Sequence, residues 1–142
     1  MPAELNGGGF QARGMTLPCG PRAPALARAA VSGWLDGHAN ANLRRDACLL
    51  VSELVTNSVM HGQATGAPLG LRVSAADGVV RVEVQDQGHN GAVVRRAPDG
   101  NGGGGGFGLQ LVEWLAARWG VSHEHGTLVW FELAAGAPAV RP

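Results

Sequence analysis

The sequence predicts an α/β two-layer sandwich, in which helices cover one face of a mixed, largely antiparallel β-sheet. The expected elements follow the order helix, helix, hairpin, loop, helix, hairpin, which lacks the strand and helix alternation of a parallel doubly wound sheet. Short glycine-containing turns inside both strand regions indicate antiparallel pairs. The 142 residues are enough for one domain around one core.

Two helices are expected first. Residues 21–35 form an alanine-rich run of high helix propensity with proline near its start. Residues 42–60 carry apolar side chains at helical spacing, with Asn40 or Asn42 as the candidate N-cap. Gly62 is a natural C-terminal stop for this second helix.

A hairpin is expected after the second helix. Residues 69–74 and 79–85 flank Asp77-Gly78, a dipeptide that favours a tight turn between antiparallel strands. Valines alternate with polar residues in the second strand, so one face of the pair should be buried. These valines are Val80, Val82 and Val84.

The rest of the chain is expected to hold a loop, a third helix and a closing hairpin. Residues 102–106 are five consecutive glycines, which indicate a mobile loop. From Leu109 to Trp119 the apolar residues return to helical spacing. Residues 121–124 and 127–133 then form two strands around a short turn.

Composition excludes several classes of protein. Eleven acidic and eleven basic residues give a net charge of zero, so no overall field favours nucleic acid or an anionic membrane. All basic residues are arginine, which excludes a P-loop, the strand lysine of eukaryotic-type kinases and Schiff-base chemistry. No secretion signal or membrane-spanning apolar run is present. Cys19 and Cys48 lack metal-ligand spacing, so we expect a cytoplasmic protein with reduced thiols.

The chain ends are expected to be flexible tails. Residues 1–13 are glycine-rich and show no regular apolar spacing, and residues 136–142 are equally irregular. The folded domain should therefore span residues 14–135.

Three chemical side chains follow one another at four-residue steps in the second helix. At about 100° per residue, Glu53, Asn57 and His61 share one stripe beside an apolar face. A carboxylate and an amide oxygen one turn apart can place a general base beside a ligand for Mg²⁺. An ordinary solvated helix face is the alternative explanation.

Two later segments suit a nucleotide. Asp86 ends a strand just before Gly88, so its carboxylate can accept a hydrogen bond from an exocyclic amine such as that of adenine; a plain turn is the alternative. The glycine run and the following helix start can bring backbone amides to phosphate, or can serve as a flexible linker. Arg95 and Arg96 lie in the same loop. The alternate histidines of His123-Glu124-His125 are more simply the polar end of a hairpin than a metal site.

Together these segments resemble the ATP-binding domain of the GHKL superfamily, and most closely the bacterial anti-sigma-factor serine/threonine kinases. The resemblance covers about residues 15–134. It is carried by an N-box, two glycine boxes and a final strand, at residues 52–62, 84–88, 106–112 and 126–133.

The resemblance implies the Bergerat ATP-binding fold and a role for each matching residue. Asn57 would bind Mg²⁺, and Glu53 would act as general base. Asp86 would bind the adenine amino group with help from Thr127, and His61 would lie near the phosphates. The glycine boxes would shape the pocket and its lid through Gly88, Gly106, Gly108 and Leu109.

The function implied is an ATP-dependent kinase that phosphorylates an anti-anti-sigma-type protein and regulates bacterial transcription by partner switching. The expected partners are proteins, with a sigma factor and a second copy of the chain among them, and neither nucleic acid nor membrane. A non-catalytic ATP-binding module that sequesters a regulator is the alternative. It is favoured by Phe107, where the family usually has a polar or basic residue, and by the glycine-dominated lid.

Overall fold

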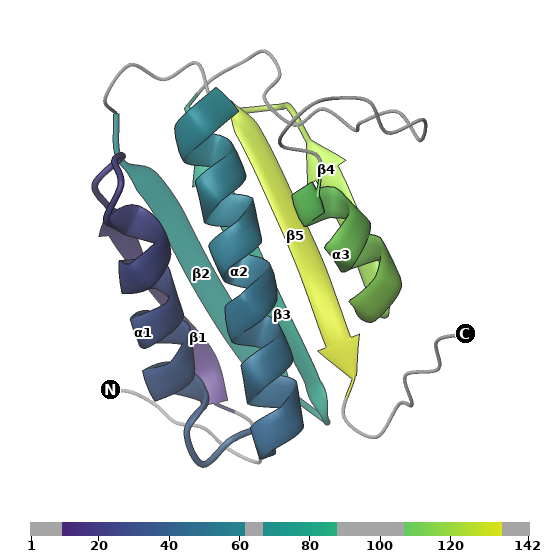
Figure 1. Ribbon diagram of the computed structural model, residues 1–142. Coiled ribbons are helices and arrows are strands. Elements are labelled where there is room, and N and C mark those ends of the chain that lie inside the picture. The colour runs from purple at the N-terminus through teal and green to yellow at the C-terminus, as the bar shows by residue number, and fades with distance from the viewer. Residues whose placement is uncertain (1–9, 62–66, 88–106, 135–142) are drawn as a thin grey trace.

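The protein is a two-layer sandwich, as predicted. The computed structural model describes residues 10–61, 67–87 and 107–134. Within these residues, five strands form one sheet in the order β1-β2-β3-β5-β4, and three helices lie against one of its faces (Figure 1). Every neighbouring strand pair that the structure describes is antiparallel, so the sheet is not mixed. The elements are β1 (Phe10–Leu17), α1 (Ala23–Leu35), α2 (Ala41–His61), β2 (Leu69–Ala76), β3 (Val79–Asp86), α3 (Phe107–Leu115), β4 (Arg118–Ser122) and β5 (Thr127–Ala134).

The edge strand β1 was not expected from the sequence. It begins at Phe10, so residues 10–13 are not part of a flexible tail. β1 pairs with β2, and Leu17, which is fully buried, lies opposite Leu69. Among the side chains of residues 12–17, Leu17 alone is buried, so this part of the strand has no alternating apolar pattern to reveal it.

Helices α1 and α2 begin where the sequence predicted. In α1 the buried side chains recur every four residues, at Ala23, Ala27, Val31 and Leu35. The side chain of Asn40 accepts a hydrogen bond of 2.8 Å from the backbone N–H of Leu43, which confirms Asn40 as the N-cap of α2. The buried face of α2 then packs between α1, α3 and the sheet.

The β2–β3 hairpin also forms as predicted. Asp77 and Gly78 have φ angles of 54° and 79°, so both central residues of the turn are left-handed, as a type I′ turn requires. Ala76 pairs directly with Val79 across this turn. The predicted valines of β3 are buried, and their polar neighbours face the other side of the sheet.

The prediction that a helix continues to Trp119 was wrong. α3 ends at Leu115, and the next amide hydrogen bonds already change partner: Ala116 N–H bonds to Val112 within the helix, but Ala117 N–H bonds to Glu132 of β5 at 2.7 Å. Trp119 lies in β4 opposite Phe131. The spacing of Trp119 from the preceding apolar residues fits a helix and a strand equally well. Pairing with β5 makes this segment a strand.

The sheet face away from the helices carries an ionic network that joins β3 to β5. Arg81 donates to Glu83 at 2.9 Å and to Glu132 at 3.0 Å, and its guanidinium lies 4.1 Å from the ring centre of Trp130. Arg81 and Glu132 are also direct partners in the strand register. The network therefore supports the same register that places Asp86 opposite Thr127.

Candidate functional site

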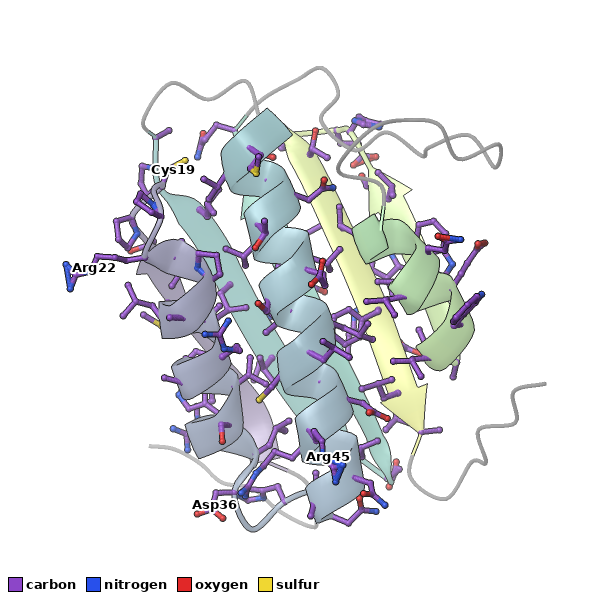
Figure 2. All side chains as sticks on the ribbon, viewed as in Figure 1. Cys19, Arg22, Asp36 and Arg45 are labelled. Atoms are coloured by element: carbon purple, nitrogen blue, oxygen red, sulfur yellow. The ribbon has the colours of Figure 1, made fainter. Side chains whose placement is uncertain are left out.

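The elements that carry several of the predicted site residues meet at one end of the molecule. α2 ends at His61, β3 ends at Asp86, and β5 begins at Thr127. Because β3 and β5 are antiparallel, Asp86 and Thr127 lie opposite each other. Figure 1 shows the end of α2 and the start of α3 at this same end of the sheet, and α2 contacts β3, β5 and α3. Asp36 and Arg45, near the α1–α2 connection, lie at the far end (Figure 2).

Asp86 and Thr127 form a buried polar pair on the helix-covered face. Each is only 1% exposed. Asp86 follows Val84 on the buried side of β3. Thr127 precedes Val129 on the buried side of β5. A carboxylate in such a place is costly unless polar groups bind it, which makes this pair a candidate for a functional site.

The turn before β5 lies directly on the end of β3. Gly126 has a φ of +88°, and a Cβ added there would overlap the carbonyl oxygen of Asp86. Only glycine can adopt this left-handed backbone and also leave room for the Asp86 carbonyl. The side-chain amide of Gln85 donates to the His125 carbonyl at 2.6 Å and also reaches the Asp86 carbonyl at 3.3 Å. Gln85 and Gly126 thus fix the turn, and with it Thr127, against β3.

Sequence reasoning assigned no role to Gln85 in the site. Its position in β3 alternates with the valines, which identifies it only as a polar residue of the open face. Its amide reaches a residue 40 positions away, a contact that depends on the strand register. The one available signal was its place beside Asp86.

His123 is also close to the buried pair. Its Nδ1 lies 3.4 Å from the hydroxyl oxygen of Thr127, while the His123 side chain itself is exposed. In the part of the chain that the structure describes, no group of three or more His, Cys, Asp and Glu residues could hold a metal ion. His123 and His125 lie in the turn between β4 and β5, and His123 contacts Thr127.

Glu53 and Asn57 lie on α2 at the border between its buried face and solvent. Both are partly exposed, whereas Leu54 and Val55 between them are buried. Ser58 is buried beside Asn57. This is the placement expected of a stripe that adjoins the packed face, and it leaves both polar groups available to a ligand.

The remaining predicted residues can be placed only in part. His61 is the last residue of α2, and Gly108 and Leu109 belong to the first turn of α3. Gly88, Gly106 and the glycine run 102–106 lie outside the described residues, as do Arg95 and Arg96. The roles predicted for these residues remain predictions.

A separate hollow lies at the other end of the molecule. It has a volume of about 270 Å³ and lies between the α1–α2 connection and the β2–β3 turn. Its lining, taken over the described residues, includes His38, Asn40 and Asp77 but no predicted site residue. Asn40 already caps α2.

An open antiparallel sheet covered by helices on one face, with a buried Asp and Thr pair at the ends of two inner strands, is consistent with the class of Bergerat-fold ATP-binding domains. The chain belongs to the family of histidine kinase-like ATPase domains, whose model matches residues 17–133. No helix of the described part is both long and apolar enough to cross a membrane.

Two solved structures are similar to this chain to different degrees. The structure of the RsbU and RsbW domains of Rv1364c from Mycobacterium tuberculosis is 25% identical, with a TM-score of 0.70, over 94% of this chain. The present chain spans 35% of that longer chain. A histidine kinase domain from the Erythrobacter litoralis EL346 blue-light activated histidine kinase is also 25% identical, with a TM-score of 0.49, over 78% of this chain and 58% of its own. No curated protein matches this chain.

Proposed function

We propose that the protein is an ATP-dependent serine/threonine kinase that phosphorylates an anti-anti-sigma-type protein and acts by partner switching. The observation that carries the nucleotide site is the buried pair of Asp86 and Thr127. The likeness to a chain that contains an RsbW domain supports the choice of kinase within the family. Cytoplasmic location and homodimerisation belong to the same proposal.

Asp86 suits recognition of adenine. An ionised carboxylate can only accept hydrogen bonds, so its complement in a base is an amino group. Adenine offers such a group, whereas the matching position of guanine is an oxygen. Burial of Asp86 excludes competing water, which strengthens this discrimination.

Asn57 is the residue that would bind Mg²⁺, together with phosphate oxygens of the nucleotide. Its amide oxygen is a hard donor, and Mg²⁺ commonly takes one or two protein ligands and completes its shell with water and phosphate. When bound, the ion would offset phosphate charge as transfer proceeds.

Glu53 is the proposed general base. It lies one helical turn before Asn57, so a substrate hydroxyl at this face would meet the carboxylate beside the metal site. Glu53 would orient that hydroxyl and accept its proton as the oxygen attacks the terminal phosphate. The residues at the start of α3, Gly108 and Leu109, would bring backbone amides to the phosphates.

The alternative is a non-catalytic module that binds ATP and sequesters a sigma factor or another regulator. Phe107 favours it, because the family usually has a polar or basic residue at this point of the second glycine box. Five successive glycines at 102–106 also favour it, because ordering them over a nucleotide is entropically expensive.

Calorimetric titration of ATP, with and without Mg²⁺, tests the site. The wild type should bind ATP more tightly with Mg²⁺, and Asp86→Asn should lose at least about tenfold in affinity, because an amide of the same shape places a donor where only an acceptor fits. Circular dichroism would show that the variant is folded. A folded wild type that does not bind ATP would contradict the proposal.

Transfer of labelled phosphate separates the two functions. The substrate to use is the anti-anti-sigma-type protein encoded nearest to the gene of this chain. Phosphorylation of its serine that depends on Glu53 supports the kinase, whereas ATP binding with stable complex formation and no transfer supports the sequestering module.

A further inference from the structure

The two edge strands of the described sheet differ in how they are protected against further pairing. β4 is five residues long and carries the charged Arg118, whereas β1 is eight residues long and contains no proline, lysine or acidic residue. Among the described strands, β2 alone pairs with β1, so the outer edge of β1 has no described strand beside it. A long edge of this kind is a template for a further strand.

The accessible part of the β1 edge is centred on Gly14. Residues 12–16 are all exposed, whereas Leu17 is fully buried. The pairing of β1 with β2 is irregular between Phe10 and Arg13 and regular from Arg13 onward. A further strand can therefore pair along residues 12–16, and Gly14 is the middle residue of that segment.

Helix α1 adds an apolar flank above this edge. One flank of α1 faces α2, because the guanidinium of Arg28 donates a hydrogen bond of 2.9 Å to the hydroxyl of Ser52. At about 100° per residue, the flank on the other side of the buried face carries Leu26, Ala30 and Gly33, none of which is charged. This flank therefore lies on the β1 side of the helix.

Two exposed apolar side chains lie where the helix flank meets the strand edge. Leu26 of α1 is 37% exposed and Met15 of β1 is 38% exposed. Met15 alternates with Gly14 and shares the helix-covered side of β1 with the buried Leu17. Figure 1 shows α1 and β1 at one lateral edge of the molecule, opposite the edge that α3 and β4 form. Residues 12–16 and the flank of Leu26, Ala30 and Gly33 are called the β1–α1 surface below.

The β1 segment is complementary to itself about a two-fold axis through Gly14. Antiparallel pairing with β1 of a second copy about this axis places the helices of both copies on the same side of the joined sheet. Arg13 then lies opposite Met15 of the second copy, so no like charges face each other. An axis through Arg13 would instead oppose two guanidinium groups, which is unfavourable.

The same axis also suits α1. β1 rises about 10 Å from Gly14 to Leu17, and α1 extends about the same distance from Ala23 to Ala30, so Gly14 and Ala30 lie at a similar height. α1 contacts both β1 and β2, which places its axis over the space between them. With paired strands about 4.8 Å apart, the two α1 axes would lie about 10 Å apart, a distance typical of packed helices.

We infer that the β1–α1 surface binds a second copy of this chain, with the β1 strands antiparallel about Gly14 and the α1 helices in contact. The inference specifies the interface of the proposed homodimer, and it rests on that part of the proposed function alone. The two sheets become continuous, and the two-fold axis sends the two candidate nucleotide sites to opposite ends of the joined sheet.

Sedimentation velocity of the full chain at several protein concentrations tests the inference, with two opposite charges introduced at one position. The wild type should form a dimer. In the inferred register residue 15 of each copy lies opposite Arg13 of the other, so Met15→Glu creates two attractive pairs and Met15→Arg two repulsive ones. The dissociation constant of Met15→Arg should exceed that of Met15→Glu at least about tenfold at low salt. Salt should narrow the difference.

Matched substitutions separate the interface from general effects of charge. Leu49→Arg places a charge at an apolar side chain of similar exposure, 41%, on α2, and it should leave dimerisation unchanged. Leu26→Glu should weaken the dimer, because it brings a carboxylate into the apolar flank of α1. Ala25→Glu, one residue earlier on the exposed side of α1, should not. Circular dichroism would show that each variant is folded.

The outcomes distinguish this inference from the nucleotide site. A wild type that remains monomeric overturns the inference, and so do equal dissociation constants for Met15→Arg and Met15→Glu. A dimer that Leu26→Glu leaves unchanged overturns the contact between the α1 helices. ATP titration of the same wild type is read separately. A dimer with the expected charge dependence that does not bind ATP contradicts the nucleotide site and supports this inference, whereas a monomer that binds ATP does the reverse.

Discussion

Substitution of Gly126 by alanine tests whether the turn before β5 positions the candidate site. The left-handed backbone, at a φ of +88°, costs a residue with a Cβ about 1–2 kcal/mol. The new Cβ would also overlap the Asp86 carbonyl and lie 3.1 Å from Cα of Gln87, both backbone atoms that cannot rotate away. The turn must therefore shift, and loss of the Gln85 hydrogen bond to the His125 carbonyl adds about 1 kcal/mol.

The expected total is a fall of about 2–3 kcal/mol in the free energy of unfolding, or about 6–9 °C in Tm for a chain of this size. Urea denaturation followed by circular dichroism would measure it. In the proposed site the same shift would displace Asp86 from the adenine amino group, so the affinity for ATP should fall at least about tenfold, the value of one hydrogen bond to a charged group.

Gly37→Ala is a matched control. Gly37 has nearly the same φ, +85°, but a Cβ there would meet no atom within 4 Å. It carries the backbone cost alone, about 1–2 kcal/mol, and lies at the far end of the molecule from the site. If Gly126→Ala proves no more destabilising than Gly37→Ala and binds ATP as the wild type does, the reasoning about the turn is refuted.

Three further substitutions have defined outcomes. Glu53→Gln should abolish phosphate transfer while ATP affinity stays within a few fold, because it keeps the shape and removes the base; retained transfer would exclude Glu53 as the base. Asn40→Ala should lower the free energy of unfolding by about 1 kcal/mol through loss of the α2 cap, whereas an unchanged urea midpoint would contradict that role. Burial raises the pKa of the Cys48 thiol from its ordinary 9.0, against the opposing effects of nearby arginines and a hydrogen bond from Ser32. The folded state thus holds this proton more tightly than the unfolded chain, so stability should be intact below about pH 9 and should fall as the pH rises from there through the folded pKa. Cys48→Ala should lessen that fall, and identical alkaline profiles for the two proteins would contradict it.

The features that could be predicted from the sequence depend on local chemistry. Asn40 caps α2 through an amide three residues ahead, and Asp77-Gly78 forms its turn with two residues that tolerate positive φ. Asp86 was identified because it ends an alternating strand and matches a family motif. Each of these signals lies within a few residues of the feature that it specifies.

The features that escaped prediction depend on contacts between distant segments. β1 is an edge strand with little apolar alternation, and Trp119 fits two periods until β5 is present to pair with it. The contacts of Gln85 and His123 depend on the register of β3 and β5 and on the turn that joins β4 to β5. The spacing of residues along the sequence does not by itself determine the register of β3 and β5.

The strand order has a consequence for how the protein is made. β5, the last described strand in the chain, lies between β3 and β4, and among the described strands it is the one that pairs with β4. Until β5 has left the ribosome, β3 has an unpaired edge and Asp86 has no threonine opposite it. The proposed nucleotide site therefore cannot assemble before β5 has emerged, and ATP bound there would stabilise only chains in which β5 has been inserted.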